Sequence, residues 1–327
     1  MMIYLVEIPN KYSKKGNRFE MNINEMQIQD AAKNVLHEIL SDIQIYSKGA
    51  YSQVYKAKYG KNGTDVVIKV YLKIGFMRME VRQLEELRKF SIVPIPQVYG
   101  CFFGDGDLTT DIYFMEFMPG VPVRFVAFDN EADRERIADA VVDAHIALHN
   151  VVNPNGFGEL DCENFSQNWE TLFHNRIDGY FQYLNTLKDS PLSAKARTLI
   201  DEAYYSFDNV FTQPVKEACL IHGDYKMKNV LIDPKTFKLT AILDPMDCCY
   251  GDRESDLFTY TNPHRDAKFG FLENYTSKVC LSDKFLLKNQ YYFLWNELKL
   301  FILMGYCFND TFEQLGQNIS DMIKYGW

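Results

Sequence analysis

The stretch from Leu220 to Pro234, LIHGDYKMKNVLIDP, combines side chains that could transfer a phosphoryl group. Asn229 follows Asp224 by five residues, and a further carboxylate, Asp244, ends the apolar segment TAILD. Phosphoryl transfer needs a carboxylate that receives the proton of an alcohol, and hard oxygen ligands that hold magnesium on the nucleotide phosphates. This pattern predicts Asp224 as the base and Asn229 and Asp244 as magnesium ligands.

An ion pair is predicted upstream of this stretch. Lys69 lies within the apolar segment VVIKV, and a lysine on a central strand is costly unless it is paired. Glu80 lies four residues after Phe76 and four before Leu84, so it shares the apolar face of the helix expected there. We expect Glu80 to pair with Lys69 and to position it on the phosphates. The alternative is a lysine that is satisfied at a sheet edge.

Two further segments are candidates for nucleotide contacts. YSKGAYSQVYKA (Tyr46–Ala57) stands where a phosphate-covering loop is expected, with Ser47 and Gly49 as the candidate residues, although it lacks the G-x-G-x-x-G pattern. In FMEFM, the backbone groups of Glu116 and Met118 could hydrogen-bond the edge of adenine.

Hydrophobic periodicity predicts the elements that carry these residues. Extended segments flank Lys61-Asn62-Gly63 and predict a hairpin, and a second hairpin is expected between Ile221 and Asp244. Other segments are expected to be helical at about Ile23–Leu40, Phe76–Phe90, EADRERIADAVVDAHIALH and Phe271 to the end, and extended at VPIPQVYGCFF and DIYFMEFMPG. This order predicts an α+β fold with a β-rich small lobe and a mostly helical large lobe.

The composition of the 327 residues is that of a globular protein, with 47% hydrophobic and 24% charged residues. The net charge of −9 argues against a nucleic-acid-binding surface. Seven cysteines without a CxxC pair indicate reduced thiols and a cytoplasmic protein. The apolar segment Tyr291–Phe308 contains Glu297 and Lys299, which favours a buried helix over a membrane span. Ile3–Ile8 is too short for a signal peptide and lacks a basic leader.

The order of these elements resembles the superfamily of aminoglycoside phosphotransferases, choline kinases and fructosamine kinases, which shares the protein-kinase-like fold. The resemblance is carried by LIHGD....N and by DPMDCCYGDRESDL (Asp244–Leu257), and it runs from about Tyr46 to Tyr260. The piece YGDRE-DL is especially similar to fructosamine kinases, and Phe157–Ile177 resembles a segment of the same enzymes.

The resemblance implies the same roles for Asp224, Asn229, Asp244, Lys69 and Glu80, with ATP and magnesium as cofactors. It also implies that Asp256, in ESDLF, accepts hydrogen bonds from the catalytic loop.

The sequence departs from the family where YKMKN replaces the usual tryptophan-serine or histidine-proline pair after the base. Lys226 takes the place of the lysine that protein kinases carry two residues after their aspartate. Such a cation could stabilise charge on the moving phosphoryl group, and a solvated loop lysine is the open alternative.

We therefore expect an N-terminal extension over residues 1–40, a nucleotide-binding small lobe over 41–120 and a catalytic and substrate lobe over 121–327. The expected enzyme moves the γ-phosphoryl group of ATP to a hydroxyl of a small, amine-bearing, sugar-like acceptor, either a ketosamine or an aminoglycoside. The two alternatives are a protein kinase and a pseudokinase-like nucleotide-binding module. The absence of D-F-G and A-P-E opposes the first, and the intact set of catalytic residues opposes the second.

Other side chains leave further alternatives. Asp247, Asp252 and Glu254 form an acidic cluster that could attract an amine. His145 and His149, four apart on a helix, could bind a metal, but no third ligand is evident, so core or surface histidines are expected instead. Trp169 and Phe173 could line a substrate cleft, although packing is the simpler expectation.

Overall fold

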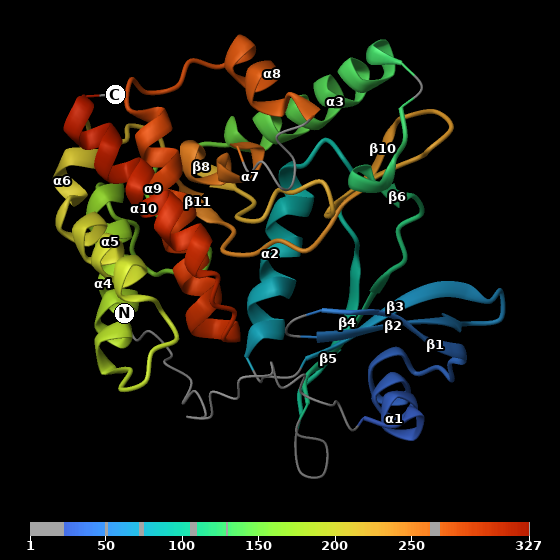
Figure 1. The fold of residues 1–327 in the computed structure, drawn as a ribbon. Coiled ribbons are helices and arrows are strands. Elements are labelled where there is room, and N and C mark those ends of the chain that lie inside the picture. Colours follow the sequence, from blue (N-terminus) through green and yellow to red (C-terminus); the bar gives the residue numbers. More distant parts are fainter. Residues whose placement is uncertain are drawn as a thin grey trace. The chain divides into compact units, whose positions relative to one another are not determined.

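Two compact units make up the chain. The sheet unit contains described residues within 23–167 and 216–280, and the helical unit contains those within 168–215 and 281–326 (Figure 1). Every residue proposed above for catalysis, magnesium or nucleotide binding lies in the sheet unit, whereas Trp169 and Phe173 lie in the helical unit. The predicted division at residues 40 and 120 stays a prediction. The structure, a computed structural model, describes residues 23–49, 52–71, 75–104, 110–128, 130–261 and 269–326.

A five-stranded antiparallel sheet has the strand order β1-β2-β3-β5-β4. Its strands are β1 (Ser41–Lys48), β2 (Ser52–Tyr59), β3 (Thr64–Tyr71), β4 (Val98–Phe102) and β5 (Ile112–Glu116). The predicted hairpin is confirmed, because β2 and β3 pair directly and Gly60 and Gly63 take positive φ at the turn between them. β3 is central, so Lys69 is not an edge-strand lysine.

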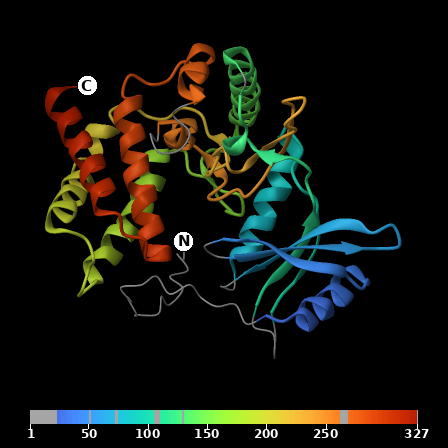
Figure 2. The same ribbon diagram turned by 45° about the vertical axis from the view of Figure 1, so that its right-hand side comes forward.

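Alternation along β3 gives the sheet two different faces. Ile68 and Val70 pack against α1 (Glu25–Leu36) in one hydrophobic cluster. Lys69 projects from the opposite face and contacts α2 (Phe76–Phe90). Figures 1 and 2 show the two helices on opposite sides of the sheet.

The helix α1 is shorter than the expected Ile23–Leu40, because its ends are set by local hydrogen bonds and backbone conformation. The side chain of Asn24 accepts from the Gln27 N–H, and the Gln27 side chain accepts from the Asn24 N–H, each at 3.0 Å. His37 ends the helix with φ 56, in the left-handed region. By contrast, α2 spans the predicted Phe76–Phe90.

Two small sheets carry the polar loops of the sheet unit, in strand orders β10-β9-β6 and β7-β11-β8. The second predicted hairpin is confirmed as the pair β9 and β10. The strands are β6 (Val121–Pro122), β7 (Gly158–Glu159), β8 (Cys219–Ile221), β9 (Val230–Ile232), β10 (Leu239–Ile242) and β11 (Cys249–Gly251). The helical segments of this part are η1 (Val123–Phe125), α3 (Glu131–His149), η2 (Arg253–Asp256), α7 (Phe258–Thr261) and α8 (Phe271–Lys278).

The helical unit consists of α4 (Trp169–Thr186), α5 (Ala194–Tyr205), α6 (Phe207–Val210), α9 (Phe285–Met304) and α10 (Asn309–Tyr325). Most of α9 is buried, which confirms the buried helix predicted for the long apolar segment. Among the residues that the structure describes, no helix has the length and apolar character needed to cross a membrane. Trp169 and Phe173 are buried and stack on each other at 5.9 Å, so they serve packing.

All seven cysteines lie within the described residues, and each is a free thiol.

Candidate active site

A tight loop after β8 brings Asp224 and Asn229 together. The Asn229 amide Nδ2 donates to the Asp224 backbone oxygen at 3.0 Å and to its carboxylate Oδ2 at 3.1 Å. Backbone bonds from Lys226 N–H to Asp224 O and from Asn229 N–H to Lys226 O, at 2.8 and 2.7 Å, close the loop. The five-residue spacing therefore places the amide against the carboxylate, and Asn229 keeps its Oδ1 for another partner.

Lys226 points into this loop. Its Nζ forms an ion pair with Asp224 Oδ2, and both side chains are partly buried. A positive charge therefore lies against the predicted base. Its catalytic role stays a prediction.

Asp244 follows β10 and closes the other end of the hairpin. Its φ of 51 is left-handed, and its Oδ1 lies 3.0 Å from Lys69 Nζ. Asn229 Nδ2 also lies 3.4 Å from the Asp244 backbone oxygen, and the Leu243 N–H donates to Asn229 O at 2.8 Å. The Lys69 charge holds the pKa of Asp244 below its ordinary value, so this carboxylate is ionised at neutral pH.

The predicted pair between Lys69 and Glu80 is confirmed, with Nζ 2.6 and 2.8 Å from the two carboxylate oxygens. Burial alone would lower the pKa of Lys69, but the charges of Asp244 and Glu80 raise it well above its ordinary value. The lysine is therefore a fixed cation between two carboxylates.

The predicted nucleotide contacts outside this cluster stay predictions. The Glu116 N–H already donates to Gln97 O at 2.8 Å, so a contact of Glu116 with adenine would use its carbonyl oxygen. Met118 is partly exposed just after β5. Ser47 and Gly49 lie at the exposed end of β1, and residues 50 and 51 of the same segment lie outside the described residues.

Gly223 allows the catalytic loop to lie directly on the segment after Asp244. It takes φ +78, and a Cβ atom there would lie 1.7 Å from the Met246 backbone oxygen and 2.9 Å from the Asp247 backbone carbon. The Met246 N–H donates to His222 O at 3.2 Å across the same contact. Only glycine fits this position, which explains the residue between histidine and aspartate.

Asp256 accepts hydrogen bonds from the backbone of the catalytic loop, as the family resemblance implied. Its carboxylate accepts from the N–H groups of His222 and Gly223 at 2.7 and 2.8 Å. It also contacts Nε2 of His145 at 3.0 Å and of His149 at 3.5 Å. Asp256 and the three histidines are all buried.

The expectation that no third group accompanies the two histidines is wrong. Asp256, 111 residues after His145, completes a buried cluster whose potential ligand atoms lie within 4.8 Å of one another. The Nδ1 atoms of His145 and His149 contact the hydroxyls of Tyr260 and Tyr275 at 2.8 and 2.7 Å. Each ring thus has a partner on both nitrogens, which confirms the expected core histidines. Burial lowers the pKa of His145 to about 3.

The prediction that the acidic cluster attracts an amine is wrong for two of its three residues, because they are buried. Asp252 and Glu254 are only 3% and 4% exposed. The Asp252 side chain accepts from the Glu254 N–H and caps η2, which packs against β8. Neither carboxylate lies on a surface open to an acceptor, and only Asp247 of the three is partly exposed.

Two tyrosines of the cluster were missed from the sequence. The hydroxyls of Tyr71 and Tyr113 donate to the Glu80 carboxylate. Tyr71 could have been found, because it lies two residues after Lys69 and therefore on the same strand face. Tyr113 could not, because it comes from a strand far along the chain.

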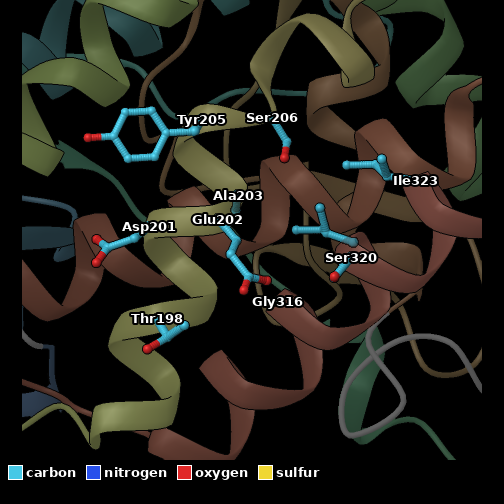
Figure 3. A pocket seen from close by; sticks show the side chains of 10 residues that line it. Thr198, Asp201, Glu202, Ala203, Tyr205, Ser206, Gly316, Ser320 and Ile323 are labelled. Carbon is cyan, nitrogen blue, oxygen red and sulfur yellow. The ribbon is translucent and has the colours of Figure 1, made fainter.

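A separate groove lies in the helical unit between α5 and α10. Gly316 lets the helices approach, since a Cβ there would lie 2.6 Å from Leu199 Cβ. Figure 3 shows Glu202 and Ser206 directed toward α10, whereas Asp201 and Tyr205 point away from it. Asp201 is paired with Arg197 at 2.8 Å. None of the predicted site residues lines this groove.

The fold and the site define a phosphotransferase with a protein-kinase-like architecture. The phosphotransferase enzyme family matches residues 42–276, well over half of the chain, and the protein belongs to that family. The suspected superfamily and the prediction of a phosphotransferase are thereby confirmed.

The similarity to other proteins covers most of the chain. The uncharacterized protein YcbJ of Escherichia coli (strain K12) is 22% identical over 283 residues, which cover 85% of this chain and 93% of YcbJ. A putative fructosamine-3-kinase from Haemophilus somnus 129PT has a TM-score of 0.65 at 17% identity, covering 89% of this chain and 96% of that one.

An aminoglycoside phosphotransferase has the same fold. A thermostable mutant of APH(4)-Ia, in a ternary complex with AMP-PNP and hygromycin B, has a TM-score of 0.64 at 16% identity, covering 88% of this chain and 95% of that one. These two solved structures confirm the predicted fold class.

Proposed function

We infer that the protein is an ATP- and magnesium-dependent kinase that phosphorylates a hydroxyl group of a small molecule. One observation carries this inference: an unbroken series of contacts joins Glu80, Lys69, Asp244, Asn229 and Asp224. A nucleotide-binding module without catalysis would have no need for a base, a cation and two oxygen ligands held together in this way.

The donor set fits magnesium. The Asn229 amide turns its nitrogen to Asp224, which leaves Oδ1, and Asp244 supplies an ionised carboxylate. Both are hard oxygen ligands of the kind that magnesium prefers. Magnesium held by them would neutralise charge on the β- and γ-phosphates.

The remaining side chains divide the work of binding and proton transfer. Lys69, held by Glu80, would bind the α- and β-phosphates. Asp224 would accept the proton of the acceptor hydroxyl as the oxygen attacks the γ-phosphoryl group. Lys226, which already contacts Asp224, would stabilise charge on the phosphoryl group in transit.

For the acceptor we keep a small, amine-bearing, sugar-like molecule, with ketosamines first and aminoglycosides second. The support is the similarity of Tyr250–Leu257 and Phe157–Ile177 to fructosamine kinases and the net charge of −9. Asp252 and Glu254 no longer contribute, because they are buried. The seven free thiols suit a reducing cytoplasm.

The test is ADP release from ATP and magnesium in the presence of a panel of hydroxyl-bearing molecules. Stimulation by at least one of them, abolished in Asp224→Asn, is expected. Comparing kcat/KM for a ketosamine, an aminoglycoside and a neutral sugar of similar size then tests the amine. Equal use of the neutral sugar would overturn the amine while leaving the kinase, and no stimulation by any acceptor together with no nucleotide binding would overturn the kinase.

A further inference from the structure

The Glu80 carboxylate accepts four hydrogen bonds. Lys69 Nζ supplies two of them, at 2.6 and 2.8 Å. Tyr113 donates its hydroxyl to Oε1 at 2.7 Å, and Tyr71 donates to Oε2. All four residues are buried and at most 8% exposed. The predicted lysine–glutamate pair is therefore part of a larger buried cluster.

The three donors come from adjacent positions on one face of the sheet. Tyr71 lies two residues after Lys69 on β3, and Tyr113 is the residue of β5 that pairs with Lys69. The two tyrosine rings stack, with centroids 6.1 Å apart and planes 27° apart. Burial raises the pKa of both tyrosines, so their hydroxyls keep their protons and act as donors.

The ends of α2 are also fixed. At its start, the Gly75 N–H donates to Asp111 Oδ2 at 3.0 Å. Further along, Tyr250 donates its hydroxyl to Glu86 Oε1 at 2.9 Å. The helix is thus tied to Asp111, the residue before β5, and to Tyr250 of β11 independently of the Glu80 cluster.

A lysine–glutamate pair alone can open and close as its helix moves, because both charges can turn to water. Here, withdrawal of α2 would break four hydrogen bonds. It would also leave two tyrosine hydroxyls without an acceptor in an apolar interior, where an unsatisfied donor is costly. We propose that Tyr71 and Tyr113 are positioning residues that keep α2 docked, so that Lys69 is oriented without nucleotide, partner or modification. The assignment of Lys69 to phosphates rests on the proposed function, whereas the docking of α2 does not.

The test compares Tyr71→Phe, Tyr113→Phe and the double variant with Tyr55→Phe. Tyr55 is a matched control because it is 8% exposed, belongs to the same sheet and packs in the cluster on the α1 face. Hydrogen exchange of the α2 amides measures how often the helix opens, and the amides of α3 serve as the internal reference. We expect roughly tenfold to hundredfold faster exchange in α2 for the variants that lose a hydroxyl, as for a lost hydrogen bond to a charged group.

The expected pattern is faster exchange in α2 with no change in α3, no such change in Tyr55→Phe, and weaker AMP-PNP binding by the double variant. Equal α2 exchange in the Tyr71, Tyr113 and Tyr55 variants would overturn the proposal and leave the tyrosines as core residues. If the double variant does not fold, the single variants decide through the same exchange measurement. If the parent protein binds no nucleotide, the proposed function fails while α2 exchange still tests the role of the tyrosines.

Discussion

Gly223→Ala should disable the site by forcing apart two backbone segments. The new Cβ would lie 1.7 Å from the Met246 oxygen and 2.8 Å from its carbonyl carbon, both backbone atoms that cannot rotate away. Asp256 holds the N–H groups on one side of the loop, and the Met246 N–H holds the other. The segments must therefore separate by on the order of 1 Å, a displacement that costs about 100-fold in rate when it reaches catalytic groups.

The substitution has a second cost that must be separated from the first. Alanine at φ +78 is in the left-handed region, which destabilises the fold by about 1–2 kcal/mol even where space is available. Gly60→Ala is the matched control, because Gly60 has φ +70 and no atom within 4 Å of the Cβ position. It should lose that stability alone and keep its activity.

Two measurements decide between these costs. Urea unfolding gives the free energy of unfolding of each variant, and ADP formation with an acceptor from the screen gives its activity. We expect Gly223→Ala to be less stable than Gly60→Ala and to lose about 100-fold in kcat/KM. Equal stability and similar activity in the two variants would refute the close approach as the reason for glycine.

Three further predictions concern titratable side chains. Asp224→Asn should lower kcat by about 10²–10⁴-fold and spare AMP-PNP binding, and near-normal turnover would exclude Asp224 as the base. Asp244→Ala should abolish transfer and the response of nucleotide binding to magnesium; an unchanged magnesium requirement in activity and binding assays would contradict the assignment. His145 should stay neutral in the folded protein, because its pKa is about 3 there against 6.5 ordinarily. Its contribution to the free energy of unfolding is therefore fully present above pH 6.5. The free energy of unfolding should fall by up to about 1.4 kcal/mol per pH unit as the pH drops from 6.5 toward 3, because the unfolded chain binds a proton that the folded chain does not. Urea unfolding that shows no loss between pH 7 and 4.5 would contradict it.

Local patterns predicted much of the sheet unit. The period of the apolar residues gave α2 its observed bounds, and the Asn-Gly turn placed the β2–β3 hairpin. The Lys69–Glu80 pair was also predictable, because each charge interrupts an otherwise apolar face and needs a partner. These features depend on residues that are close in sequence, where spacing decides which side chains share a face.

Residues far apart in sequence could not be paired in the same way. Asp252 and Glu254 were interpreted as part of an acidic cluster that attracts an amine, but both are buried in η2 or at its start. His145 and His149 read as a pair without a third partner, although Asp256 lies against both. Periodicity identifies the face on which a side chain lies, but it does not identify the distant element that will cover that face.

The sequence by itself determined the chemistry available to this protein: a carboxylate, an amide and a second carboxylate at fixed spacing around a hairpin, with a lysine and a glutamate to complete the set. Only the tertiary structure decided how firmly that set is held. Tyr113 reaches Glu80 from 33 residues away, and Asp256 reaches the loop of Gly223 from 33 residues away. Such contacts depend on the order of strands and the burial of polar groups, because a buried donor or acceptor stabilises the fold only when its distant partner is brought into place.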